Sequence, residues 1–165
     1  FDASVCHYVE KSRFKSFLNK INLGNLVYTG VALKRLFLDP LVDVELTLDD
    51  GEPLSFSRVY FAACMNHPYE GGGFLFCPDA KTDDGMLDVI VASNLPRLKV
   101  LFVLPTAFFG KHTGFSGVDI FKCRKAEIRV KDSCPIHTDG EPIAFAECLK
   151  AEVCKEQVML MAPAV

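Results

Sequence analysis

The chain of 165 residues carries two acidic segments whose side chains are suited to chemistry. The first is the turn Asp83-Asp84-Gly85, which enters an alternating segment at residues 86–91. Hard cations bind carboxylate, carbonyl and water oxygens, and a tight turn can direct several such oxygens at one point. Asp-Gly pairs are also common in ordinary hairpin turns. The turn therefore predicts either a Mg²⁺ or Ca²⁺ site or a solvated acidic turn.

The second acidic feature is the pattern Asp-Gly-Glu-Pro, which occurs twice and contains Glu52 and Glu141. Each copy lies between expected strands. A glutamate in a turn beside a cleft can act as a general base when burial or neighbouring charges tune its pKa. Glu52 follows a regular alternating run, whereas Glu141 follows a polar, irregular segment at residues 134–138 that could line a cleft. Composition and spacing do not decide which glutamate, if either, has this role.

The remaining motifs exclude several kinds of site. Gly71-Gly72-Gly73 indicates positive φ angles or a close approach to the backbone. No helix containing Lys followed by Ser or Thr comes after these glycines, so they are not a P-loop. The four histidines are widely separated, and no Gly-x-Ser-x-Gly segment occurs. The seven cysteines lack Cys-x-x-Cys spacing, which indicates buried free thiols and neither a zinc site nor a disulfide framework.

Short strands dominate the elements that must position these residues. Strand patterns lie at residues 42–48, 54–56, 59–65, 86–91, 118–130, 144–153 and 157–161. Helical patterns occupy residues 9–20, 25–37 and 97–109, the last with an expected break near Pro105. Many short strands at hairpin spacing predict a mainly β fold, a two-layer β-sandwich with two or three short helices.

Charge and hydropathy restrict the class of partner. The net charge is −3 and no basic cluster stands out, which argues against nucleic acid as the partner. The longest apolar run, residues 98–109, is shorter than the roughly twenty residues that a membrane-spanning helix needs. The first residues lack the apolar region of a signal peptide, which favours a cytoplasmic location. The absence of an initiating Met indicates a fragment of a longer protein.

Four segments resemble, in order, the motifs of the diacylglycerol kinase-like lipid kinases, a group that includes bacterial diacylglycerol kinases and sphingosine and ceramide kinases. They are Phe1-Asp2-Ala3 with Val5; Asn66 with Gly71-Gly72-Gly73; Pro78-Asp79-Ala80 with Asp84-Gly85-Met86-Leu87-Asp88-Val89; and His137-Thr138-Asp139-Gly140-Glu141. Each motif alone is weak, whereas four in this order over nearly the whole chain are specific.

The resemblance implies that residues 1–165 form the C-terminal, substrate-side β-sandwich domain of a two-domain kinase distantly similar to NAD kinases. The implied reaction transfers the γ-phosphoryl group of ATP to a lipid hydroxyl such as that of diacylglycerol. Glu141 matches the family's proposed general base. Asp84 matches a carboxylate that holds a structural or regulatory Mg²⁺, with Lys81 and Met86 supplying backbone carbonyls. The three glycines are interpreted as close backbone packing near the interdomain cleft.

The family's N-terminal α/β domain, which binds ATP through a Gly-Gly-Asp-Gly-Thr loop, has no counterpart in this sequence. The isolated domain is therefore expected to be inactive, because phosphoryl transfer needs clamped phosphates. Expected partners are that N-terminal domain, the lipid substrate and, transiently, a membrane surface. The expected location is cytoplasmic or peripheral at a membrane, and a homodimer is left open. A non-catalytic lipid-binding module and an NAD kinase-like enzyme are the alternative functions.

Overall fold

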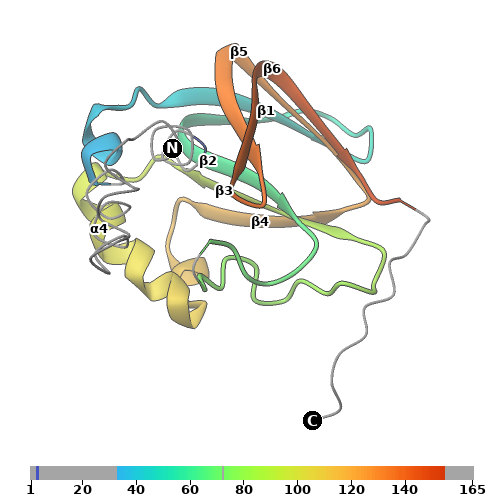
Figure 1. Cartoon of the computed structure of the whole chain (residues 1–165), viewed down its shortest axis with the longest axis horizontal. Helices are drawn as coiled ribbons and strands as arrows, with labels where there is room; N and C mark the ends of the chain where they lie inside the picture. Colours follow the sequence, from blue (N-terminus) through green and yellow to red (C-terminus); the bar gives the residue numbers. More distant parts are fainter. Residues whose placement is uncertain (1–2, 4–32, 72, 155–165) are drawn as a thin grey trace, which may run out of the picture.

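The computed structural model of the protein describes residue 3, residues 33–71 and residues 73–154 (Figure 1). The helix predicted at residues 9–20 and the strand predicted at residues 157–161 lie outside this part of the chain. Of the helix predicted at residues 25–37, the described portion is helical over residues 33–38.

A single antiparallel sheet is the framework of the described part. Its six strands follow the order β4-β3-β2-β1-β5-β6. Their bounds are β1 (Val42–Leu48), β2 (Leu54–Met65), β3 (Leu87–Ser93), β4 (Val118–Cys123), β5 (Lys125–Thr138) and β6 (Glu141–Glu152). The alternating patterns predicted at residues 42–48 and 54–56 are thus confirmed as paired strands of one hairpin.

One helix and two short 3₁₀ segments connect β3 to β4. They are α4 (Arg97–Thr106), η1 (Ala107–Phe109) and η2 (Lys111–Gly114). The predicted break near Pro105 is confirmed, because α4 ends at Thr106 and the chain continues as η1. A proline ring disfavours continued helix by clashing with the preceding turn.

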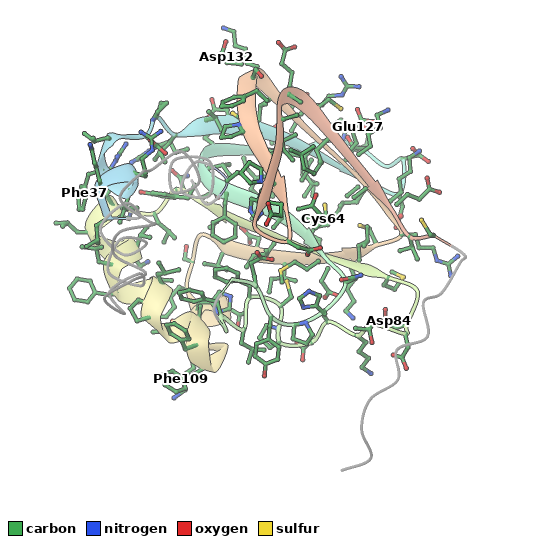
Figure 2. The ribbon with its side chains drawn as sticks, in the orientation of Figure 1. Phe37, Cys64, Asp84, Phe109, Glu127 and Asp132 are labelled. Carbon is green, nitrogen blue, oxygen red and sulfur yellow. The ribbon has the colours of Figure 1, made fainter. Side chains whose placement is uncertain are left out.

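The hairpin of β5 and β6 bends back over the rest of the sheet. Its pairing runs from Lys125 opposite Glu152 to Thr138 opposite Glu141, with a register break between Arg129 and Cys134. Figure 1 shows both strands rising to the top of the view and turning down again, and Figure 2 places Asp132 at this corner. Extra residues at such a break bend a strand. The bend brings the tip of the hairpin over the middle of the sheet.

The apolar core lies on both faces of the sheet. One face gathers residues from five strands: Val44, Leu46, Val59, Val89, Val91, Cys123, Ala126 and Ile128. Ile128 of β5 reaches this cluster together with Val91 of β3, although β1 and β2 separate their strands in the sheet, so the sheet curls around the cluster. The opposite face is covered by α4, η1 and the segment at residues 74–80. The prediction of a mainly β, sandwich-like fold with few helices is confirmed, with both layers built from one curled sheet.

The cysteine prediction holds in part. The six cysteines of the described residues are free thiols, of which Cys77 and Cys123 are buried and Cys154 is exposed. Burial raises the pKa of Cys64 and of Cys77 to about 12, so both thiols stay protonated and unreactive. Within the described residues, no group of three His, Cys, Asp or Glu side chains is arranged to hold a metal ion.

Candidate active site

Glu141 begins β6 directly after the tip of the bent hairpin. The two preceding residues, Asp139 and Gly140, have positive φ angles of 51° and 81°, which form a tight turn. The backbone N–H of Gly140 donates a hydrogen bond to His137 Nδ1 at 3.2 Å. The Glu141 side chain is exposed. The structure therefore places this glutamate at the end of an ordered turn that opens to solvent.

The turn before Glu141 faces the loop between Glu70 and Phe74, which we call the glycine loop. A hollow of about 310 Å³ is lined by His67, Tyr69, Glu70, Gly71, Gly73, Asp139 and Gly140. The two segments lie more than sixty residues apart in sequence, and the bend in β5 and β6 brings them together. Two of the predicted motifs thus line one hollow. Glu52 belongs to the turn between β1 and β2, a separate hairpin.

Within the described chain, positive φ angles account for Gly71 and Gly73 at the hollow. Gly71 and Gly73 have φ angles of 26° and 98°, and a Cβ on either would meet nothing within 4 Å. Glu70 and Phe74 exchange backbone hydrogen bonds of 2.8 and 3.0 Å across the loop, which makes it tight. The positive φ angles agree with the first interpretation of the motif, and close backbone packing near the interdomain cleft stays a prediction.

The acidic turn is closed by a lysine from a neighbouring strand. Asp84 Oδ1 accepts a hydrogen bond from the Met86 backbone N–H at 2.9 Å. Asp84 Oδ2 lies 3.1 Å from Lys122 Nζ, which also donates to the carbonyl oxygen of Asp79 at 3.3 Å. The hydrogen bond from Lys122 lowers the pKa of the Asp84 carboxyl group. This carboxylate is therefore ionised at neutral pH.

A second carboxylate lies behind the turn. Asp88 is 1% exposed, and its Oδ2 is 3.7 Å from Lys122 Nζ without a hydrogen bond. Burial raises the pKa of Asp88, and attraction to Lys122 opposes this effect. Lys122 therefore faces both carboxylates and is the positive partner they share. The sequence spacing did not indicate that Lys122 would lie beside these two aspartates.

The donor chemistry of the acidic turn fits a hard cation in part. An ionised carboxylate such as that of Asp84 is the kind of ligand that Mg²⁺ prefers. The ammonium group of Lys122 already supplies positive charge at Oδ2, so a bound cation would share this carboxylate with the lysine or displace it. Lys81 is exposed, and Met86 contacts Asp84 through its N–H. The metal ligands Lys81, Asp84 and Met86 remain a prediction.

An apolar cavity that the sequence did not reveal lies between α4 and the sheet. Its volume is about 40 Å³, and its lining residues are Tyr60, Phe61, Phe76, Ala92, Leu95, Val100, Val103, Leu104, Ala107, His112 and Val118. His112 is 3% exposed, its Nε2 lies 3.0 Å from the Phe76 carbonyl oxygen, and its Nδ1 has no partner. Burial lowers the pKa of His112, so a neutral imidazole lines the cavity. The lining residues form no recognisable sequence motif, because they converge from six separate segments of the chain.

The curled sheet and its bent hairpin place the described part of the chain in the class of β-sandwich-like domains. Residues 1–161 match the family model described as the YegS C-terminal NAD kinase beta sandwich-like domain, and the chain belongs to this family. A Bacillus subtilis (strain 168) protein named as a candidate lipid kinase, YtlR, is 31% identical over 161 residues, which cover 84% of this chain and 52% of YtlR. A Mycobacterium tuberculosis (strain CDC 1551 / Oshkosh) protein named diacylglycerol kinase is 35% identical over 86 residues, covering 50% of this chain and 26% of that protein.

Solved structures show the same fold. A crystal structure of a candidate diacylglycerol kinase from Bacillus anthracis strain Sterne matches with a TM-score of 0.59 and 21% identity, over 76% of this chain and 40% of that one. The chain spans about half the length of YtlR, 52%. No helix among the described residues is long and apolar enough to span a membrane.

Proposed function

We propose that this chain is the substrate-side domain of an ATP-dependent lipid kinase that phosphorylates a lipid hydroxyl such as that of diacylglycerol. The observation that carries the proposal is the hollow in which the Asp139-Gly140 turn, immediately before Glu141, faces the glycine loop. Relatives named as lipid or diacylglycerol kinases support the reaction.

In the proposed reaction, the Glu141 carboxylate accepts the proton of the lipid hydroxyl. The hydroxyl oxygen forms a bond to the γ-phosphorus of ATP as the bond to the bridging oxygen breaks, and ADP leaves. Glu141 is exposed and directly follows Asp139 and Gly140, which line the hollow, so a substrate can reach it. The phosphates of ATP must be clamped for this step, and we assign that task to an N-terminal ATP-binding domain. On this proposal the isolated chain is inactive.

The test is Glu141→Gln in the full-length protein, with Glu52→Gln as the matched control from the other Asp-Gly-Glu-Pro turn. Loss of a general base lowers kcat by about 10²- to 10⁴-fold, so we expect such a loss for Glu141→Gln and unchanged kcat for Glu52→Gln.

The assay measures phosphate transfer from labelled ATP to a panel of lipids, with NAD as a further acceptor. Unchanged turnover in Glu141→Gln would remove Glu141 from the mechanism. Absence of lipid phosphorylation by the wild-type protein would favour the lipid-binding module, and phosphorylation of NAD would favour the NAD kinase-like enzyme.

We also propose that Asp84 holds a structural Mg²⁺ with the backbone carbonyls of Lys81 and Met86. When bound, the ion would neutralise the carboxylate and fix the turn. Its support is the ionised state of Asp84, whose pKa is lowered by Lys122. We expect Mg²⁺ to raise the melting temperature of the wild-type protein and not that of Asp84→Ala. Equal shifts in both proteins would place any bound Mg²⁺ elsewhere.

A further inference from the structure

The outer surface of α4 and η1 is apolar and exposed. Leu98, Phe102 and Phe109 are 66%, 76% and 74% exposed. Leu98 and Phe102 lie four residues apart and therefore share one side of the helix. The opposite side carries the buried Val103, which lines the cavity against the sheet. A helix at the surface of a globular protein normally turns polar residues outward, and α4 is apolar on both sides.

The helix at residues 33–38 extends this apolar surface. Arg97, at the start of α4, donates hydrogen bonds to the carbonyl oxygens of Leu36 at 2.6 Å and Asp39 at 2.8 Å, which fix the two helices together. Figure 2 shows Phe37 beside one end of α4 and Phe109 at the other. We call this surface the α4 face; its exposed apolar residues are Leu33, Phe37, Leu38, Leu98, Phe102 and Phe109.

Basic residues outnumber acidic ones in the segments that form the α4 face. Residues 93–117 contain three basic residues and no Asp or Glu, although the chain as a whole has a net charge of −3. Lys111 is exposed beside Phe109, and Lys34 is exposed beside Leu33. The carboxylate nearest in sequence, Asp39, is paired with Arg35 at 2.9 Å. Figure 2 places the acidic turn at Asp84 on the far side of the view from Phe37.

We propose that the α4 face docks on the surface of an anionic lipid bilayer. Phe102 and Phe109 enter the boundary between headgroups and acyl chains, and Lys34 and Lys111 contact anionic headgroups. An apolar surface with basic residues is the pattern of proteins that lie on membranes. An anionic bilayer matches both parts of this surface, because its interface takes up apolar side chains and its headgroups attract the lysines. The choice of a bilayer as partner rests on the proposed lipid substrate.

The test measures binding of the full-length protein to sucrose-loaded vesicles in the absence of ATP. Vesicles contain either phosphatidylcholine alone or phosphatidylcholine mixed with phosphatidylglycerol. Burial of a Phe side chain strongly favours the apolar phase, so Phe102→Ser combined with Phe109→Ser should weaken binding to the mixed vesicles by more than about tenfold. Lys34→Glu combined with Lys111→Glu should weaken the same binding by roughly fivefold or more per lysine and leave binding to phosphatidylcholine unchanged. Leu54→Ser, an exposed apolar residue on β2, is the control and should bind as the wild type does.

Two results would overturn the proposal. In the first, the double Phe variant binds the mixed vesicles as tightly as the wild type. In the second, this variant loses both thermal stability and phosphorylation of a short-chain, water-soluble substrate, which would mean that the α4 face packs against the rest of the protein. Vesicle binding without ATP does not depend on phosphoryl transfer. A protein that binds through the α4 face and phosphorylates no lipid would refute the proposed reaction alone.

Discussion

Gly117 lies where the chain between η2 and β4 passes against the end of β3, and it leaves no space for a side chain. Its φ angle is +97°, and a Cβ on this residue would lie 2.4 Å from the Ser93 carbonyl oxygen and 3.0 Å from Leu95 Cγ. The Gly117 carbonyl oxygen also accepts a hydrogen bond from the Ser93 N–H at 2.8 Å. Gly117→Ala therefore requires the backbone of one of these segments to move.

The cost of Gly117→Ala has three sources. An L-residue held at this φ angle costs on the order of 1–3 kcal/mol. Relief of the overlap with Leu95, which is 3% exposed, is an overpacking problem that costs about 1–3 kcal/mol. Separation of the two segments loses the hydrogen bond from Ser93, a further 1 kcal/mol or so. We expect a loss of about 3 kcal/mol or more in the free energy of unfolding.

Urea denaturation at neutral pH measures this loss, and thermal denaturation should show a melting temperature lower by roughly 6–12 °C. Gly114→Ala is the matched control, because its Cβ would meet nothing within 4 Å and its φ angle is not in the left-handed region. We expect Gly114→Ala to keep the wild-type stability or to exceed it slightly. A loss of less than about 1 kcal/mol in Gly117→Ala would refute the argument, because it would mean that the two segments yield without strain.

Two further predictions concern the packing of α4 on the sheet. The Tyr60 hydroxyl donates a buried hydrogen bond to the Leu95 carbonyl oxygen at 2.8 Å. Tyr60→Phe should therefore lower the free energy of unfolding, measured by urea denaturation, by about 1–3 kcal/mol. An unchanged midpoint would show that water replaces the hydroxyl. Burial lowers the pKa of His112 below its usual 6.5, so the folded state binds fewer protons than the unfolded state. Stability should therefore be fully present above pH 6.5 and decline as the pH falls below it, and His112→Gln should remove this part of the pH dependence; an equal decline in the variant would assign it to another group.

The hairpin of β1 and β2 could be predicted because its signals are local. Alternation places Val44 and Leu46 on one face, and both are buried in the core. The chain from Val118 to Val130 looks like one strand for the same reason, but the structure divides it into β4 and β5. The division occurs at Arg124, where Asp49 Oδ1 accepts hydrogen bonds from the N–H groups of Arg124 and Lys125. No turn residue marks this position, and the carboxylate that caps the turn lies 75 residues away.

The candidate site shows the same division between local and distant signals. Turn chemistry identifies Asp84 and the residues before Glu141, whereas the hollow beside Glu141 depends on the bend in β5 and β6. That bend occurs between Arg129 and Cys134, in a segment without glycine. A register break without a glycine has no strong sequence signal. The sequence therefore identifies the two motifs that line the hollow but does not predict that they face each other.

Asp88 shows how packing can bury a side chain that the alternating pattern predicts to face solvent. Alternation along β3 pairs Asp88 with Ile90 on one face, and an aspartate in an alternating strand is expected to face solvent. The segment at residues 74–80 covers that face, since Ile90 packs with Phe76 and Cys77, and β3 is buried on both sides. Asp88 is thereby carried into the interior, opposite Lys122 in the β3–β4 register. A buried carboxylate needs a positive partner, and strand register supplies one across 34 residues of sequence. The acidic turn consequently contains its own cation, and the proposed Mg²⁺ would have to compete with it.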